Sequence, residues 1–533
     1  MALFRHIPIS SSSSYLLLLS ALCLCLGSSY AGADSDFLQP ECLQVPTVVF
    51  AGSVKTTIEV VEQVASLVSK YAPAFGDFRL SNAISDCLDL LDLSADELTR
   101  TLSASQNPNG KNNGTGNLRA DLRTWLSGAL GNQDTCMEGF EGTNGIVQNL
   151  VAGGLYQVTS LIKDILGNVA SDAQGHRVNN DGGSHPQQER KLNSKRNAHS
   201  YPYWFRDEDR KMLQVVNGVS ADVVVAKDGT GNFTNVTDAI SAAPEYSTTR
   251  FVIYIKKGVY NEYIEISKKK WNLMMVGDGM DVTVISGNRS YVDHWSTYRS
   301  ATFAALGDGF MAQSIGFRNT AGPEKHQAVA LRVQADRSIF LNCRMEGYQD
   351  TLYAQTHRQF YRSCFITGTI DFIFGDSAAI FQNCDMYVRK PLDNQQNIVT
   401  AQGRTDRHET TGIVIQNCHI LADASLEPEK KRIKTYLGRP WKEFSRTIIM
   451  ESEIDDLIHP DGWLPWDKDF GLKTLYYAEF NNKGPGASVA ARVKWPGLKV
   501  INKDDATKYT VGPFLQGDSW VNAAGVPVHF GLY

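Results

Sequence analysis

In the first third of the chain, apolar residues recur at three- and four-residue spacing, which is typical of amphipathic helices. The three clearest stripes are Ile84, Leu88, Leu91 and Leu98; Leu118, Leu122, Trp125 and Ala129; and Val147, Leu150, Val151, Leu155, Val158, Ile162 and Ile165. The stretch at residues 56–71 predicts a fourth helix, and Pro46 and the polar run at residues 106–116 mark breaks. We therefore predict an antiparallel four-helix bundle over residues 34–168.

The predicted bundle shows no obvious chemistry of its own. It contains no histidine, and its carboxylates are spread over polar helix faces, where we expect nearly all of them to be solvated. The apolar period then gives way to Gly, Asn, Ser and basic residues, so residues 169–213 are predicted to be a linker. Basic clusters at residues 190–193 and 210–213 would be good protease sites in an exposed segment, and a solvated charge run is the alternative.

Residues 214–533 change to short runs of β-branched and aromatic residues, such as 251–255 and 282–285. Within them an apolar-x-polar-Cys repeat ends at Cys343, Cys364, Cys384 and Cys418. The cysteines are 21, 20 and 34 residues apart, and the last gap is a repeat with an insertion. A period near 20 predicts one coil of a parallel β-helix per repeat. An antiparallel barrel is the alternative, although it explains the equal spacing less well.

Two carboxylates occupy equivalent places in this repeat. Asp350 and Asp371 each lie seven residues after a cysteine, so we expect them on adjacent coils, about 4.8 Å apart in the stacking direction. Like charges that close cannot both ionise freely, so one pKa should rise and the other stay low, giving an acid and a nucleophile or base. Turn residues, or half of a calcium site, are the alternative interpretations.

Amide and cationic side chains accompany the two aspartates. Gln349 precedes Asp350, and Gln327 lies 22 residues upstream, again about one coil, which suits stabilisation of an oxyanion. Arg439 and Trp441 offer a charged fork and a flat apolar face that would suit an acidic sugar. A structural arginine and a core tryptophan are the alternative.

Four segments together resemble the plant pectin methylesterases. They are residues 258–262 (GVYNE), 349–353 (QDTLY), 368–375 (GTIDFIFG) and 437–441 (LGRPW), and they occur in the order seen in that family. The resemblance implies a right-handed parallel β-helix that removes methyl esters from the galacturonate units of cell-wall pectin. It also implies that residues 214–533 form the catalytic part.

The resemblance assigns roles to the candidate residues. It makes Asp371 the nucleophile, Asp350 the acid and then the base, and Gln327 and Gln349 the holders of the oxyanion. Arg439 would orient Asp371 and contact the substrate. The sugar contacts would be Thr297, Gln327, Arg439 and Trp441. We expect no cofactor and no metal, since the sequence contains no zinc-type cluster, no G-x-S-x-G and no H-E-x-x-H.

The helical block resembles the inhibitor domain that many of these enzymes carry as a pro-region. Cys87 and Cys136 match its disulfide, whereas Cys42 lacks the partner that usually follows about ten residues later. In the catalytic part, the family disulfide maps to Cys364 and Cys384. Pairing of Cys343 with Cys364 is equally reasonable from spacing alone.

Targeting and processing can also be predicted. Arg5, an apolar run at residues 16–26 and small residues at 31–33 indicate a secretory signal peptide over residues 1–33; a membrane anchor is the alternative, but the run is short. The cluster ending at Leu213 resembles a subtilase-type processing site, which would leave Gln214 as the first residue of a secreted cell-wall enzyme. Glycosylation sequons occur at Asn113, Asn232, Asn235 and Asn288.

Composition and charge exclude several other classes. The 533 residues are 42 % hydrophobic and 20 % charged, which excludes a wholly disordered chain. Residues 1–213 hold 17 basic against 22 acidic residues, and the remainder is neutral, so nucleic acid is not an expected partner. We expect a monomer whose partners are methyl-esterified homogalacturonan, a proteinaceous pectinesterase inhibitor and a processing protease, with no membrane contact after signal removal.

Two competing functions remain at the level of sequence. A polygalacturonase shares the β-helix, and residues 432–434 (RIK) match one of its motifs, but its N-T-D and G-H-G motifs are absent. A glycosidase would also not require an adjacent glutamine pair. A non-catalytic wall-binding or inhibitory protein is the second alternative, and the presence of Asp350, Asp371 and Arg439 argues against it.

Overall fold

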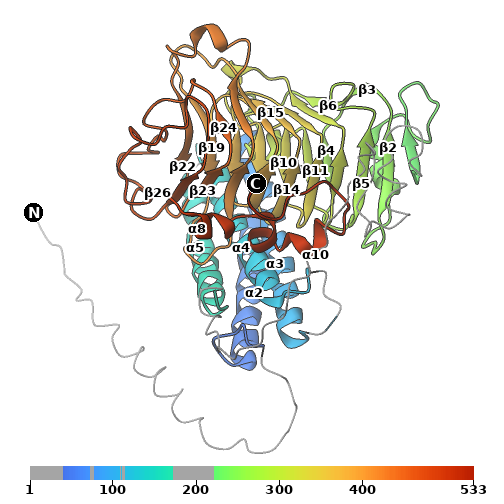
Figure 1. Cartoon of the computed structure of the whole chain (residues 1–533). Helices are drawn as coiled ribbons and strands as arrows, with labels where there is room; N and C mark the ends of the chain where they lie inside the picture. The colour runs from blue at the N-terminus through green and yellow to red at the C-terminus, as the bar shows by residue number, and fades with distance from the viewer. Residues whose placement is uncertain (1–39, 72–76, 109, 111–113, 144, 172–220) are drawn as a thin grey trace, which may run out of the picture. The chain divides into compact units, whose positions relative to one another are not determined.

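The computed structural model describes residues 40–71, 77–108, 110, 114–143, 145–171 and 221–533 (Figure 1). The predicted signal peptide, Asn113 and most of the predicted linker, including both basic clusters, lie outside the described residues. Within the described part, no helix is long and apolar enough to cross a membrane.

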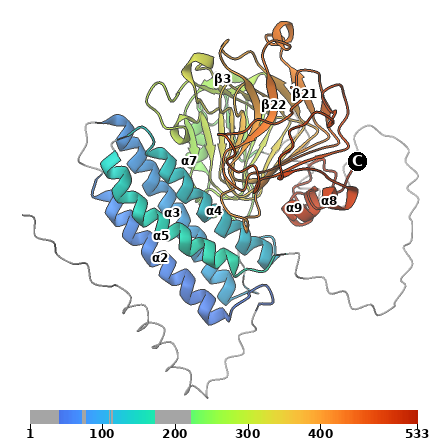
Figure 2. The same cartoon turned by 90° about the vertical axis from the view of Figure 1, so that its left-hand side faces the viewer.

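The N-terminal part is a four-helix bundle, as predicted. Its helices are α2 (Thr47–Ser69), α3 (Phe78–Gln106), α4 (Leu118–Gly139) and α5 (Gly145–Gly167), which lie side by side in Figure 2. The first helix begins directly after Pro46, nine residues earlier than its apolar stretch indicated. The side chains of Asp77 and Asn117 cap α3 and α4 by accepting hydrogen bonds from backbone N–H groups of the first turn. A disulfide joins Cys87 of α3 to Cys136 of α4.

The C-terminal part is a right-handed parallel β-helix, and the alternative of an antiparallel barrel is wrong. The chain passes repeatedly through three parallel sheets, so that each coil stacks on the previous one (Figure 1). Among the described residues, sheet 1 consists of β1 (Val223–Val225), β2 (Phe251–Ile255), β5 (Leu273–Gly277), β8 (Met311–Gln313), β11 (Ser338–Leu341), β14 (Arg358–Arg362), β17 (Ala378–Gln382), β20 (Gly412–Gln416), β23 (Arg446–Met450), β25 (Tyr476–Phe480) and β26 (Leu498–Val500).

The other two sheets follow the same order along the stack. Sheet 2 consists of β3 (Gly258–Asn261), β6 (Thr283–Gly287), β9 (Gly316–Asn319), β12 (Arg344–Glu346), β15 (Phe365–Gly368), β18 (Asp385–Val388), β21 (His419–Ala422) and β24 (Glu453–Ile454). Sheet 3 consists of β4 (Ile264–Ile266), β7 (Phe303–Ala305), β10 (Leu331–Val333), β13 (Leu352–Ala354), β16 (Ile373–Gly375), β19 (Asn397–Gln402) and β22 (Thr435–Pro440).

Short helices complete this part of the chain. They are α7 (Val236–Ala242), α8 (Lys503–Thr507), α9 (Val511–Leu515), α10 (Gly517–Trp520) and the 3₁₀ turns Tyr298–Ser300, Pro323–Lys325 and Glu427–Glu429. Apolar residues of α8 to α10 pack on the outer face of sheet 1.

The strand register confirms that the cysteine repeat marks successive coils. Leu341, Arg362, Gln382 and Gln416 are paired across β11, β14, β17 and β20, and each lies two residues before a repeat cysteine. In each coil, the residue between this paired residue and the cysteine has a positive φ, because the chain turns there from sheet 1 to sheet 2. The inward column beside this turn contains stacked aromatic rings, such as Phe340 on Tyr361, with centroids 4.9 Å apart.

The expected Cys364–Cys384 disulfide is absent from the structure, in which both residues are buried free thiols. Cys343 and Cys418 are free as well, so the alternative Cys343–Cys364 bond is also absent. The backbone N–H of Cys364 donates a hydrogen bond to the Cys384 sulfur at 3.4 Å. The coils are therefore stacked by backbone ladders and core packing, with the cysteines as one column of small apolar side chains.

The bundle packs on the outer face of sheet 3. Tyr353, Phe374 and Ala401 project from β13, β16 and β19 into the same apolar cluster as the helix core. Helix α4 approaches the sheet edge very closely at Gly128, where an added Cβ would lie 2.6 Å from the Cε1 atom of His357. Only a residue without a side chain fits at this point of the contact.

Candidate active site

The two candidate aspartates occupy the same turn on consecutive coils. Leu352 pairs with Ile373 in sheet 3, and Asp350 and Asp371 each lie two residues before this pair. Both aspartates have left-handed backbone conformations, with φ of 62° and 51°. Asp tolerates this backbone region better than most residues. Because both aspartates have the same turn conformation on adjacent coils, both carboxylates point into one buried site.

Arg439 holds one of these carboxylates in a fork. It lies in β22, two strands beyond Asp371, and its Nε donates to the two carboxylate oxygens at 2.9 and 3.2 Å. A further hydrogen bond runs from Nη2 to Oδ2. The flat face of the guanidinium lies over Trp466, with its carbon 4.2 Å from the ring centroid. Asp371 is therefore fixed in orientation and kept next to a permanent positive charge.

The electrostatic environment separates the roles of the two aspartates. Burial, reinforced by the neighbouring charge of Asp371, raises the pKa of Asp350 well above its ordinary value. Burial also raises the pKa of Asp371, but Arg439 opposes that shift through its charge and hydrogen bonds. The expectation that one pKa stays low is thus wrong in direction for Asp371. The order of the two pKa values is as expected: Asp350 keeps its proton to a higher pH, and Asp371 ionises more readily.

All the predicted site residues of the β-helix line one cavity of about 500 Å³. They are Thr297, Gln327, Gln349, Asp350, Asp371, Arg439 and Trp441. Further lining residues were not predicted: Trp295, Tyr298, Tyr353, Phe374, Lys442 and Trp466. Lys442 is adjacent to the predicted Trp441, whereas no sequence pattern pointed to Trp466, because the 24 residues between Trp441 and Trp466 have no fixed period.

The bundle supplies one wall of this cavity. Thr135 of α4 lies within hydrogen-bond distance of the Tyr353 hydroxyl, at 3.2 Å. The Nζ of Lys442 lies 2.7 Å from an Asp134 carboxylate oxygen and 2.6 Å from one of Glu138, both on α4. Asp86 of α3 is buried and pairs with Arg299 of the β-helix. The expectation of solvated carboxylates is therefore wrong for these residues.

Among the described residues, no group of three or more His, Cys, Asp or Glu side chains is arranged to hold a metal ion. The groups that the cavity does bring together are two carboxyl groups, one of them held by an arginine, and two side-chain amides. Such a set can provide a carboxylate nucleophile, a protonated carboxyl group and two hydrogen-bond donors.

Comparison with known proteins identifies both parts of the chain. Residues 222–518 match the family model described as Pectinesterase. The chain belongs to the pectinesterase family. Residues 19–167 match the model of the plant invertase/pectin methylesterase inhibitor family. This pectinesterase therefore carries an inhibitor-like helical bundle ahead of its catalytic β-helix, and it is an ester hydrolase that acts on pectin.

Two plant relatives match almost the whole chain. A pectinesterase/pectinesterase inhibitor of Prunus persica is 56 % identical over 98 % of this chain and 97 % of its own. A probable pectinesterase/pectinesterase inhibitor of Arabidopsis thaliana is 52 % identical over 98 % of this chain and 100 % of its own.

Solved structures resemble the catalytic part. The pectin methylesterase from carrot is 50 % identical and has a TM-score of 0.59; it covers 60 % of this chain and all of its own. The Aspergillus niger pectin methylesterase is 30 % identical with a TM-score of 0.50, covering 57 % of this chain and 96 % of its own. The carrot chain corresponds in size to the β-helix, so a β-helix of this family exists as a separate folded chain.

Proposed function

We propose that this pectinesterase hydrolyses the C6 methyl ester of galacturonate through a covalent intermediate on Asp371. A carboxylate oxygen of Asp371 attacks the ester carbonyl, and the bond from C6 to the methoxy oxygen breaks. Asp350 gives its proton to the leaving methoxide, which departs as methanol. Asp350, now a carboxylate, takes a proton from water, whose oxygen attacks C6 and frees Asp371 and the acid product.

The observation that carries this proposal is the fork from Arg439 to Asp371 beside a second carboxyl group of higher pKa. A nucleophile must be ionised and oriented, and an acid must hold its proton at the same pH. The arginine acts as a positioning residue for Asp371. Neither arrangement would be needed if both aspartates were only turn residues.

Gln327 and Gln349 are proposed to stabilise the oxyanion of the tetrahedral intermediates. Both line the cavity of the aspartates, and both are only partly buried. Their backbones are coupled on adjacent coils, since the N–H of Ala328 donates to the carbonyl of Gln349 at 3.2 Å. Amide N–H groups held at this spacing can both face one substrate oxygen. Thr297 and Trp441, which line the same cavity, would contact the sugar ring.

Replacing Asp371 by Asn tests the nucleophile. We expect the release of methanol from esterified pectin to fall by at least about 10³-fold, because the amide cannot form the ester intermediate. Asp385→Asn on β18 is a matched control, since that side chain is half-exposed on the far sheet. Methanol and new reducing ends should be followed together. Substantial turnover by Asp371→Asn would overturn the assignment, and reducing ends without methanol would indicate a glycosidase.

We further propose that the bundle restrains activity until it is removed. Two helices form a wall of the cavity that contains the aspartates, and Asp134 and Glu138 bind Lys442 inside it. A long polysaccharide cannot lie across a site that is walled on this side. Methanol release by the chain before and after cleavage between bundle and β-helix tests this proposal. Equal activity in both forms would contradict it.

Secretion and processing remain proposals from the sequence. We propose a signal peptide over residues 1–33, a pro-region over 34–168, a linker over 169–213 and a mature enzyme that acts in the cell wall. Asn232 and Asn288 are exposed on the β-helix, whereas Asn235 caps α7 and its side-chain amide donates to Asp238 at 2.7 Å. N-terminal sequencing of the secreted protein would locate the cut, and mass spectrometry would show which of these asparagines carry glycans.

A further inference from the structure

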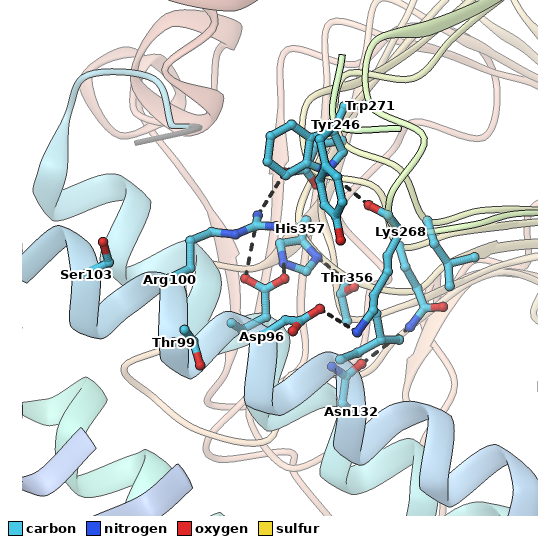
Figure 3. Close-up of a pocket in the computed structure, with 15 residues that line it drawn as sticks. Asp96, Thr99, Arg100, Ser103, Asn132, Tyr246, Lys268, Trp271, Thr356 and His357 are labelled. Carbon is cyan, nitrogen blue, oxygen red and sulfur yellow. Dashed lines mark hydrogen bonds and ion pairs between the residues drawn. The ribbon is translucent and has the colours of Figure 1, made fainter. Parts of the chain in front are cut away.

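Two buried carboxyl groups of the β-helix face each other, outside the cavity of the catalytic aspartates. The polar cavity of about 320 Å³ beside α3 shows the usual arrangement of charges, in which Lys268 reaches the carboxylate of Asp96 (Figure 3). By contrast, Asp376, directly after β16, and Glu409, shortly before β20, are 6 % and 1 % exposed and are hydrogen-bonded to each other. Two carboxylates have no hydrogen to share, so this pair must hold a proton.

The hydrogen-bond partners show which of the two residues carries the proton. Asp376 accepts at Oδ1 from the Gln402 amide at 3.0 Å and from the Thr411 hydroxyl at 2.5 Å. Its buried Oδ2 meets no N–H or hydroxyl donor among the described residues, which leaves this oxygen for a proton on Glu409. Burial and the charge of Asp376 raise the pKa of Glu409 well above its ordinary value, whereas burial raises the pKa of Asp376 to about 6. Above pH 6, therefore, Asp376 is ionised and Glu409 donates to it.

The charges around the pair favour one ionised carboxylate but do not neutralise a second. Arg404 and Arg446 supply positive charge from two sides, and Asp134 of α4 adds a negative charge. Arg404 donates to backbone carbonyls of its own loop and of Phe444, and Arg446 donates to the carbonyl of Thr411. Within the described part of the chain, neither arginine forms an ion pair with the two carboxyl groups. A second negative charge here would therefore meet the first one directly.

The amide of Gln402 connects the pair to the backbone of two coils. Gln402 ends β19; its Nε2 donates to Asp376, and its Oε1 accepts from the backbone N–H groups of Arg404, at 3.0 Å, and Arg446, at 2.7 Å. An amide can use both ends in this way only when an acceptor faces its nitrogen. Ionised Asp376 therefore helps to fix the first residues of the segment 403–411 and the beginning of β23.

Trp441 packs against the backbone that this amide fixes. A Cβ atom on Gly403 would lie 2.9 Å from the Cε3 atom of the Trp441 ring, so the ring approaches this close only because residue 403 is a glycine. The backbone N–H of Phe444 donates to the carbonyl of Arg404 at 3.1 Å, which ties the segment after Trp441 to the same loop. A displacement of residues 403–411 would therefore displace the support of the ring.

We propose that Asp376 and Glu409 are positioning residues that share one proton and thereby hold Trp441 in place for the sugar ring. This inference rests on the proposed function, in which Trp441 contacts the sugar. Loss of the shared proton would leave two carboxylates in direct contact, and their repulsion would displace residues 403–411. Substrate binding should then weaken at high pH through a group that takes no part in the chemical steps.

The variant Glu409→Gln tests the shared proton, because its amide donates permanently to Asp376 in nearly the same volume. KM and kcat for methanol release should be measured from pH 6 to pH 9 on the enzyme cleaved from its bundle. We expect KM of the unsubstituted enzyme to rise about tenfold over this range, and KM of Glu409→Gln to stay constant. The alkaline fall in kcat that Asp350 causes should remain in both. Glu453→Gln, exposed on β24, is the matched control and should behave as the unsubstituted enzyme.

A second variant, Glu409→Ala, separates this role from a purely structural one. It removes the proton and also the two hydrogen bonds that Glu409 accepts from Thr405, so KM should be raised at every pH. Glu409→Gln should instead keep the low KM that the unsubstituted enzyme has at pH 6. The proposal would be overturned by a KM of the unsubstituted enzyme that does not change with pH, or by a KM that rises equally in Glu409→Gln.

Unfolding of the full chain gives a readout that needs no turnover. Because the pKa of Glu409 is raised, its contribution to stability is fully present below its unfolded pKa and is lost as the pH rises through the folded value. The unfolding midpoint of Glu409→Gln, relative to that of the unsubstituted chain, should therefore increase between pH 5 and pH 8. A constant difference would overturn the shared proton. An unsubstituted enzyme that releases no methanol would refute the proposed function instead, while the midpoints would still decide the proton.

Discussion

Arg439 donates hydrogen bonds to both carboxylate oxygens of Asp371 from a strand two steps away in the same sheet. The residues are 68 positions apart in the sequence, and the pairing of β16, β19 and β22 brings them together. We expect Arg439→Lys to keep a positive charge but lose the fork, and to reduce kcat by about 10²-fold. Arg439→Gln also removes the charge.

The pH profile separates these two variants. The arginine lowers the pKa of Asp371, so its loss should raise that pKa and move the acid limb of kcat/KM to higher pH in Arg439→Gln. The limb should move less in Arg439→Lys. A loss of activity with no displacement of the limb in either variant would mean that Arg439 supports the fold and does not position Asp371.

The activity of the released enzyme should have a bell-shaped pH dependence. The proposed mechanism requires ionised Asp371, whose pKa lies above its ordinary value of 3.8, so activity should fall as the pH decreases through this raised value. It also requires protonated Asp350, so activity should fall again as the pH rises through the strongly raised pKa of that group. Measurement of kcat/KM against pH checks both limbs. An acid limb at or below pH 3.8 would exclude Asp371 as the group concerned.

Asp350→Asn should inactivate the enzyme and stabilise it. The folded-state pKa of Asp350 is raised, so its contribution to stability is fully present below the unfolded pKa and is lost as the pH rises through the folded pKa. At pH 7, far above the unfolded pKa, this raised pKa disfavours the folded state, and an amide should increase the free energy of unfolding by about 1 kcal/mol or more. Denaturant unfolding at pH 7 and pH 4 checks the sign, because the gain should shrink at the lower pH.

Loss of the α4 carboxylates should activate the uncleaved chain. The double variant Asp134→Asn, Glu138→Gln removes both partners of Lys442 without changing the volume of the side chains. We expect methanol release by the uncleaved chain to increase by about tenfold, since each charged contact contributes about 1 kcal/mol or less to docking. Asp164→Asn on the exposed side of α5 is the control. Unchanged activity would show that these contacts do not restrain the enzyme.

Gly128→Ala should undock the bundle without weakening it. The new Cβ would lie 2.6 Å from the Cε1 atom of His357, whose Nε2 is held 3.2 Å from Glu97, so the ring cannot move freely. Alanine also increases helix propensity by about 1 kcal/mol, so α4 itself should be more stable. The expected result is higher activity of the uncleaved chain. Gly153→Ala on α5, where nothing lies within 4 Å, should leave activity unchanged.

Local sequence patterns were sufficient for the architecture. The three- and four-residue stripes predicted α3, α4 and α5, and the cysteine spacing predicted the coils, because each pattern reports a periodic structure directly. The equivalence of Asp350 and Asp371 followed from the same register. Patterns could not predict the early start of α2 or the free state of Cys364 and Cys384, since these depend on packing and on covalent chemistry between coils.

The sequence by itself thus determined the helical and β-helical parts, the pair of aspartates and, through four motifs, the family. Only the tertiary structure decided how these parts interact: Arg439 on Asp371, Trp466 on Arg439, and the carboxylates of α3 and α4 on Arg299 and Lys442. The physical reason is that a register fixes positions within one repeat, whereas ion pairs between separate elements depend on how their faces meet. For that reason, acidic residues that the helical pattern alone predicted to be solvated form ion pairs with basic residues of the β-helix.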